Sequence, residues 1–188
     1  MPQLNLLHIP ANEDVVYTPD EVARDVVNFF NPSGSILEPA AGDGAFLRYL
    51  PTAAWCELTQ GRDFFAWSNR VDWVIGNPPY SIFAEWLRHS FEIADNIVYV
   101  IPINKVFNSN RTLKDIYTYG GVKTIFVIGG GHNTHIRWKL GFAVGAVHFQ
   151  RGYTGGIQVV FRTPPNKRVQ ADPLPAVDDG DNSNSAGG

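Results

Sequence analysis

The chain has 188 residues, 44% of them hydrophobic, and a formal net charge of −3. This length and composition predict one domain with an ample core. No stretch is apolar enough to span a membrane, the N-terminus does not resemble a signal peptide, and a single cysteine excludes a disulfide framework, so we expect a cytoplasmic protein.

Apolar periodicity and turn residues predict alternating helices and strands. Helices are expected over residues 19–30, 45–49, 82–94 and 112–119. Strands are expected over residues 35–37, 55–58, 72–75, 97–101, 122–128, 141–150 and 157–161. This order predicts a doubly wound, mostly parallel α/β sheet with an antiparallel C-terminal hairpin. Residues 1–163 would form the domain, and the acidic Pro-, Asp-, Ser- and Gly-rich residues 164–188 a disordered tail.

Charge is distributed unevenly along the chain. Residues 1–95 carry 5 basic and 13 acidic side chains, residues 96–170 carry 10 basic and one acidic, and residues 171–188 carry four acidic and no basic ones. A basic half that is otherwise well folded favours a polyanionic partner. The alternative is that these lysines and arginines only solubilise the surface.

The first predicted strand runs into a loop of small residues, Glu38-Pro39-Ala40-Ala41-Gly42-Asp43-Gly44. Ligands of open α/β sheets bind beyond the carboxyl ends of strands, and the lack of bulk here allows close approach to the backbone. The loop offers carboxylates where a phosphate would need a cation. It therefore suits a positively charged ligand with many donors, such as S-adenosylmethionine (AdoMet), although Gly-rich turns alone are a weak signal.

A second motif, Gly76-Asn77-Pro78-Pro79-Tyr80, directly follows the strand expected over residues 72–75. The two prolines lack N–H donors and have nearly fixed φ, so the turn is stiff. It would present the Asn77 side-chain oxygen and the Pro78 carbonyl beside the ring of Tyr80. Two acceptors and a ring suit a planar group with an exocyclic NH₂. The alternative is an ordinary Pro-rich turn in which Tyr80 only packs.

With both motifs in this order, residues 15 to 150 resemble class I AdoMet-dependent methyltransferases of the Asn-Pro-Pro-Tyr type, which make N6-methyladenine in DNA. The resemblance implies a Rossmann-like methyltransferase fold, AdoMet as cofactor, DNA as partner and a setting in restriction–modification. It implies that the catalytic residues are Asn77, Pro78, Pro79 and Tyr80. Asn77 and the Pro78 carbonyl would accept the two N6–H groups, and Tyr80 would stack on a base flipped out of the duplex.

The resemblance also implies a set of AdoMet contacts. The loop after the first strand would hold the methionine part, an acidic residue ending the second strand the ribose hydroxyls, and an Asp-Phe pair the adenine. An N-terminal Tyr/Thr-Pro element would lie over the methionine end. The residues at these positions are Tyr17, Thr18, Pro19, Glu38, Ala40, Gly42, Asp43, Gly44, Glu57, Asp63 and Phe64. We also expect Thr18 as helix N-cap and Pro19 at N1.

The chain departs from the family pattern in two places. Glu57 and Asp63 are six residues apart, too few for a parallel crossover, so we expect no helix between them and a loop or sheet-edge segment at 63–65. No long segment is left for a separate target-recognition domain, which favours a short or loosely read target.

The predicted loop 129–139 carries Arg137, Trp138 and Lys139, a mixture that suits phosphates and splayed bases. The alternative is a long hairpin loop with Trp138 on the core. His132 and His135 lie close together here, but their spacing with other ligand types predicts no metal site. Cys56, in a predicted strand, is expected to be a buried spectator.

Three other functions compete with DNA adenine methylation. RNA adenine and protein glutamine present a similar flat NH₂, and a non-catalytic binder could keep the fold. The basic half favours nucleic acid over protein, the fuller likeness to DNA enzymes favours DNA over RNA, and the intact Asn77, Pro78, Tyr80 and Glu57 argue against a non-catalytic binder.

Overall fold

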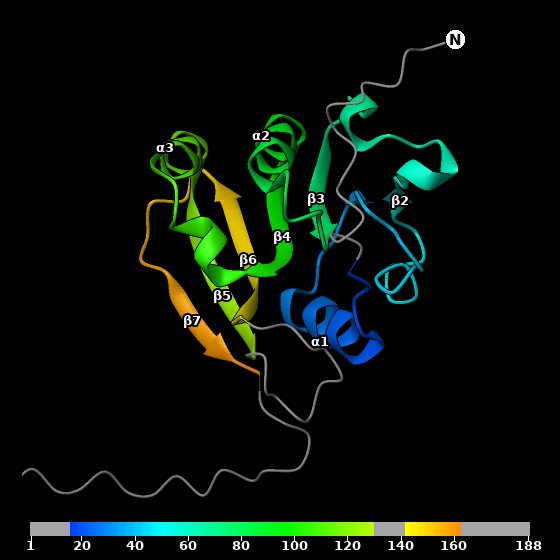
Figure 1. Ribbon diagram of the computed structural model, residues 1–188, viewed down its shortest axis with the longest axis horizontal. Coiled ribbons are helices and arrows are strands. Elements are labelled where there is room, and N and C mark those ends of the chain that lie inside the picture. Colours follow the sequence, from blue (N-terminus) through cyan, green and yellow to red (C-terminus); the bar gives the residue numbers. More distant parts are fainter. Residues whose placement is uncertain (1–15, 130–141, 163–188) are drawn as a thin grey trace, which may run out of the picture.

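The structure, a computed structural model, describes residues 16–129 and 142–162. In this part of the chain a seven-stranded sheet has the order β2-β1-β3-β4-β6-β5-β7 (Figure 1). Its strands are β1 (Ile36–Glu38), β2 (Ala54–Trp55), β3 (Val71–Gly76), β4 (Ala94–Pro102), β5 (Gly120–Gly129), β6 (Val144–Arg151) and β7 (Gln158–Phe161). The helices are α1 (Asp20–Phe30), α2 (Phe83–Ile93) and α3 (Asn110–Tyr119), with 3-10 turns η3 (Leu58–Gln60), η4 (Phe64–Ala66) and η5 (Ile103–Val106).

The strand directions confirm the predicted doubly wound sheet. β2, β1, β3 and β4 are parallel to one another, β6 lies antiparallel between β4 and β5, and β7 pairs with β5 in parallel. β5 and β6 are therefore the expected antiparallel hairpin. Because β1, β2, β3 and β4 are parallel, their carboxyl ends meet at one edge, where ligands of open α/β folds bind.

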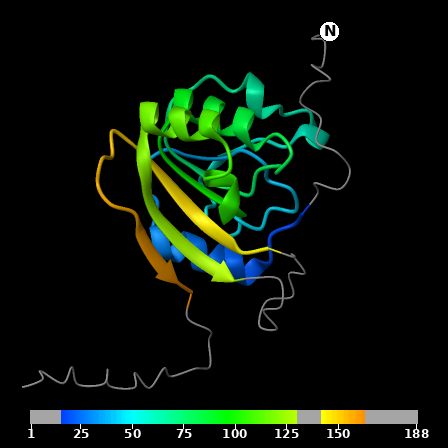
Figure 2. The same cartoon turned by 60° about the vertical axis from the view of Figure 1, so that its left-hand side comes forward.

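Helices cover both faces of the sheet and give the domain three layers (Figure 2). α2 and α3 pack on one face and α1 on the other. Along β4, Ile97, Tyr99 and Ile101 enter the core under α2 and α3, whereas Val98 and Val100 enter the core against α1. A strand buried on both faces is apolar at successive positions, which is why its sequence shows no alternation.

The C-terminal end of the described chain passes the start of β5 and is then held against α1. Between β6 and β7 the chain crosses the start of β5, where a Cβ on Gly120 (φ +156°) would lie 2.3 Å from the carbonyl oxygen of Gln150. This crossing therefore needs glycine. After β7, Arg162 forms an ion pair with Asp25 of α1 at 2.6 Å, and its side chain is only 8% exposed.

Three local predictions are wrong. Residues 45–49 form consecutive turns and no helix, because five residues stopped by Pro51 cannot offset the cost of helix nucleation. Pro19 occupies the N-cap of α1 and not N1, and no side chain caps this helix. The second strand covers residues 54–55 instead of 55–58, because the chain turns into η3 at Leu58.

Candidate active site

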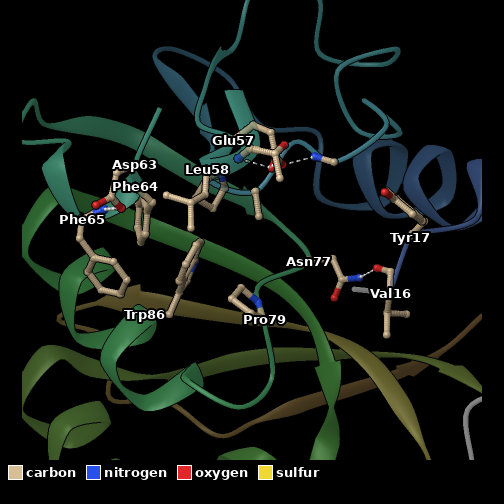
Figure 3. Close-up of a pocket in the computed structure, with 14 residues that line it drawn as sticks. Val16, Tyr17, Glu57, Leu58, Asp63, Phe64, Phe65, Asn77, Pro79 and Trp86 are labelled. Atoms are coloured by element: carbon tan, nitrogen blue, oxygen red, sulfur yellow. Dashed lines mark hydrogen bonds between the residues drawn. The ribbon is translucent and has the colours of Figure 1, made fainter. Parts of the chain in front are cut away.

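A cavity of about 260 Å³ opens at the carboxyl ends of β1, β2 and β3 (Figure 3). Its walls come from the segment before α1, the loops after these three strands, and α2. The lining residues are Val16, Tyr17, Pro39, Ala40, Gly42, Glu57, Leu58, Thr59, Asp63, Phe64, Phe65, Asn77, Pro79 and Trp86. The small-residue loop begins at Glu38, and the motif with the Asn-Pro-Pro-Tyr tip begins 38 residues later, at Gly76. Residues of the loop and of the tip line the same cavity.

Glu57 lies two residues after the end of β2, and both of its carboxylate oxygens accept hydrogen bonds from the protein. Oε2 accepts a hydrogen bond from the Gly42 N–H at 2.8 Å, and Oε1 accepts from the N–H and hydroxyl of Thr59 at 3.1 and 2.7 Å. Burial opposes ionisation, but these hydrogen bonds outweigh it and lower the pKa of Glu57. Oε1 thereby uses both of its lone-pair sites, whereas Oε2 keeps one for a hydroxyl of a ligand.

Glu38, the last residue of β1, lies behind the cavity wall. Its side chain is 1% exposed, and a Cβ on Gly76 would lie 2.2 Å from its Oε1. Gly76 therefore makes room for Glu38 directly before Asn77. Burial raises the pKa of Glu38 well above its ordinary value. No hydrogen-bond partner reaches its Oε2 from residues 16–129 or 142–162.

Asn77 has a fixed side-chain orientation. Its Nδ2 donates to the Val16 carbonyl oxygen at 2.8 Å, drawn as a dashed line in Figure 3. Its Oδ1 is buried and receives no hydrogen bond within the described part of the chain. A buried acceptor without a donor costs about 1–3 kcal/mol, so Oδ1 indicates a place for a donor from a ligand. Pro79 lines the cavity beside it, and Pro78 is buried.

The far end of the cavity is apolar and aromatic. The rings of Phe64 and Trp86 lie 4.6 Å apart between centroids, and Leu58 and Phe65 complete the wall. Asp63 caps η4 by accepting from the Phe65 N–H at 3.0 Å. Residues 64–66 are thus a 3-10 turn, which confirms that this segment is no third strand.

Sequence reasoning missed Trp86 as a wall residue. The aromatic residues of α2 recur at helical spacing, which predicts core positions and gives no reason to expect a ligand contact. At 7% exposure, Trp86 both packs in the core and lines the cavity. Its neighbour Leu58 was missed because η3 replaces the expected strand there.

The N-terminal segment closes the other end of the cavity. Tyr17 is 60% exposed, and its ring lies 3.4 Å from where a Cβ of Gly42 would be. Thr18 and Asp43 line a smaller hollow of about 30 Å³ next to the same loop, together with Ala40 and Gly42. Pro19 and Gly44 (φ +81°) do not line either hollow, and they shape the backbone beside it.

Tyr80 does not line the cavity. Its side chain is 9% exposed, belongs to the core under α2, and meets the ring of Phe142 edge to face at 6.2 Å. Its carbonyl oxygen accepts a hydrogen bond from Lys105 Nζ at 3.1 Å. Lys105 belongs to η5, directly after β4. No local sequence pattern marks Lys105, which is why sequence reasoning missed it.

Several predictions fall on residues outside the described ranges: Arg137, Trp138, Lys139, His132 and His135 in residues 130–141, and the tail 164–188. Among the described residues, no three His, Cys, Asp or Glu side chains gather as metal ligands do. None of the helices there has the length and hydrophobicity that a membrane crossing requires. Cys56 is buried as predicted, and burial raises the pKa of its thiol to about 11.

No protein-family model matches the sequence, and no curated protein is significantly similar to it. Solved structures do match. A Listeria monocytogenes protein assigned to the class I S-adenosylmethionine-dependent methyltransferases has a TM-score of 0.61 and 13% identity over 83% of this chain and 68% of its own. The fold is that of the class I methyltransferases.

Two further structures extend the comparison. A chain from a type I restriction–modification system has a TM-score of 0.60 and 17% identity, over 79% of this chain and 45% of its own. A Pyrococcus horikoshii protein assigned as an RNA methyltransferase has a TM-score of 0.55 and 19% identity, over 77% and 89%. This methyltransferase fold thus spans under half the length of the restriction–modification chain.

Proposed function

We propose that this protein transfers the methyl group of AdoMet to the exocyclic N6 amine of adenine in DNA. The observation that carries the proposal is the orientation of Asn77: its amide nitrogen is held by Val16, and its buried Oδ1 is left as an acceptor at the end of β3. The fold supports methyl transfer as the reaction class. Two similar structures come from type I restriction enzymes or restriction–modification systems, which favours DNA modification as the setting.

The cavity fits AdoMet in shape and chemistry. The ionised Glu57 would accept from a ribose hydroxyl through Oε2, and the apolar wall of Leu58, Phe64 and Trp86 would hold the adenine, with Asp63 at the edge of that wall. The methionine part would lie along Ala40 and Gly42 toward Tyr17 and Asp43, where the backbone carries little bulk. When bound, AdoMet supplies an electrophilic methyl group on its sulfonium.

The protein's own contribution to the reaction is positioning. Asn77 Oδ1 and the Pro78 carbonyl would each accept one N6–H of the target adenine. This pulls the nitrogen toward a tetrahedral geometry and turns its lone pair toward the cavity. The two acceptors also stabilise the positive charge that develops on the amine, and the stiff Pro78-Pro79 turn keeps them in place. The base has to leave the duplex to reach this point.

The test combines binding and transfer. Calorimetry with AdoMet measures the cofactor step, and transfer of label from radioactive AdoMet to DNA, RNA and protein, followed by digestion and mass spectrometry, identifies the methylated group. We expect AdoMet binding and N6-methyladenine in DNA. Label confined to RNA or to glutamine would refute the DNA substrate and keep the reaction class. No AdoMet binding would refute the proposal entirely.

A further inference from the structure

The cations of the described chain fall into two groups. The cations before β4, at the end of β6 and directly after β7 have partners. The ion pairs are Arg24–Asp25, Arg48–Asp20, Arg70–Asp95, Arg88–Asp115, Arg151–Asp95 and Arg162–Asp25, and Arg62 lies over the ring of Trp55. Lys105, Arg111, Lys114 and Lys123 form no ion pair with any described residue, and the first three lie close together in the sequence. The segment from 103 to 114 carries Lys105, Arg111 and Lys114 and no carboxylate.

This segment lies beside the Asn-Pro-Pro-Tyr tip. β3 and β4 are paired in parallel, with Gly76 opposite Tyr99. β4 therefore continues three residues beyond the end of β3, to Pro102, and η5 begins there, next to the tip. Lys105 Nζ reaches the Tyr80 carbonyl at 3.1 Å, and the Ile103 N–H donates to the Ala143 carbonyl at 3.0 Å. η5 is thereby tied to both the tip and the start of β6, and Figure 1 shows it at the end of β4 from which the chain passes to α3.

The side chains that this segment exposes have the composition of a nucleic-acid contact. Arg111 and Lys114 are exposed and three residues apart on α3, so they share one face of the helix. Phe107 is 48% exposed between Lys105 and Arg111. Unpaired cations bind phosphates and set register, and an exposed aromatic ring offers a stacking surface to an unpaired base.

We infer that Lys105, Arg111 and Lys114, with Phe107 among them, form the surface that binds the phosphodiester backbone of the strand carrying the target adenine. We call these four residues the basic rim. The inference rests on the proposed function and deepens it, because it places the substrate strand along η5 and the start of α3. Lys105 has a second role as a positioning residue that fixes the Tyr80 end of the tip.

The cation test uses the full chain, a labelled adenine-containing DNA duplex and fluorescence anisotropy at several salt concentrations. Arg111→Ala/Lys114→Ala should weaken binding roughly tenfold or more near 0.1 M salt and lower the log–log salt slope by about two, one for each lost phosphate contact. The control, Arg24→Ala/Lys123→Ala, removes the same charges from α1 and from the start of β5. It should leave both quantities within twofold of the wild type.

The aromatic test separates stacking from charge. Phe107→Ala should weaken binding to single-stranded, adenine-containing DNA roughly five- to tenfold with an unchanged salt slope, because a base–aromatic stack releases no counterions. Tyr117→Ala removes a ring that is 77% exposed at the other end of α3 and should have no effect. Equal losses in Phe107→Ala and Tyr117→Ala would overturn the role of Phe107.

Failure of the rim and failure of the proposed function give different results. If the two double variants weaken DNA binding equally, the basic rim is refuted and the proposed function stands. If the wild type binds AdoMet but no nucleic acid, both the basic rim and the DNA substrate are refuted. If DNA binds with the expected dependence on Arg111 and Lys114 while AdoMet does not bind, the rim stands and the proposed function fails. Lys105→Arg should retain most of the kcat that Lys105→Met loses, because only the arginine keeps a donor for the Tyr80 carbonyl.

Discussion

The cavity beside β2 and the basic rim beside β4 lie along the same sheet edge. They differ in whether their charged side chains have partners within the protein. In the cavity, Glu57 is held by three hydrogen bonds from the protein before any ligand arrives. On the rim, Arg111 and Lys114 have no ionic partner among the described residues. An enclosed small ligand needs oriented groups, whereas a polyanion needs charges that are free to exchange counterions.

The difference follows from where the sequence places its acids. Residues 1–95 hold 13 of the carboxylates, so the arginines of that half find partners as it folds. Residues 96–170 contain one carboxylate, Asp115, and it forms an ion pair with Arg88 of α2 at 3.1 Å. The basic half is therefore left with a positive surface. The predictions below test whether each region depends on the feature that distinguishes it.

The largest effect is expected at Asn77, where the two regions meet. Asn77→Ala should lower turnover at least about a hundredfold and leave AdoMet affinity nearly unchanged, because it removes an oriented acceptor for the developing charge. Single-turnover methyl transfer and AdoMet calorimetry measure the two quantities. Asn69→Ala, an exposed asparagine before β3, is the matched control and should behave as wild type. A turnover within a few-fold of wild type in Asn77→Ala would contradict the role of Asn77.

The second prediction separates the charged surface of the basic half from its core. His148 on β6 is 4% exposed, stacked on Trp73 at 5.2 Å, with its Nε2 3.1 Å from Asn96 Oδ1. Burial, and to a lesser degree the nearby Lys123, lowers the pKa of His148 to about 4. The imidazole is therefore neutral at pH 7, and the positive charge of this half belongs to its surface.

Between pH 6.5 and 4, His148 is protonated in the unfolded chain but remains mostly neutral in the folded chain. Stability therefore falls with falling pH in this window, by up to about 3 kcal/mol at pH 4 at 1.36 kcal/mol per unit of pKa. Urea unfolding of wild type and His148→Gln across this range measures the effect, since the difference between the two cancels the carboxylates. Parallel curves would show that His148 titrates normally.

The sequence predicts best where the signal is local. The strand ending in Asn77-Pro78-Pro79-Tyr80 and the small-residue loop from Pro39 to Gly44 each combine an apolar run with backbone-specific residues. Such patterns act over a few residues, so the strand ends and the shared sheet edge could be inferred from them. The short span from Glu57 to Asp63 likewise excluded a crossover helix, and the structure has one 3-10 turn within this span and a second directly after it.

The rest depends on contacts between distant residues. Glu38 was predicted to contact the cofactor because of its place in the loop, but its burial depends on Gly76 from a neighbouring strand. The hydrogen bond of Lys105 joins residues 25 apart. Trp86 of α2 lines the cavity beside Phe64 of η4, which lies 22 residues earlier in the sequence. Hydrophobic periodicity describes one helix or strand at a time and carries no information about contacts between residues that are distant in the sequence.

The third prediction weakens the cavity alone. Glu57→Gln replaces one acceptor by an NH₂ that must face the N–H of either Gly42 or Thr59, so both the local structure and the ribose contact suffer. AdoMet affinity should fall by about 2 kcal/mol, the scale of a hydrogen bond to a charged group, while DNA affinity stays the same. Glu85→Gln, an exposed carboxylate on α2, is the matched control. Loss of DNA binding in Glu57→Gln would mean that the two regions are not separable.

The smallest effect is expected at Tyr80, whose ring packs in the core under α2 and whose carbonyl accepts a hydrogen bond from Lys105. The Lys105 bond uses the backbone, so substitutions of the side chain test the ring alone. Tyr80→Phe keeps the ring and should change kcat and the KM for DNA less than twofold. Tyr80→Leu keeps apolar bulk in a side chain that is 9% exposed and should raise the KM for DNA by about fivefold, or about 1 kcal/mol, the low end of a base–aromatic stack. The fluorescence of a 2-aminopurine at the target position should increase on base flipping in the wild type, Tyr80→Phe and Tyr80→Leu. Quenching of this fluorescence by the protein should be weakest in Tyr80→Leu. If Tyr80→Phe is as impaired as Tyr80→Leu, the hydroxyl carries the function and the ring does not stack.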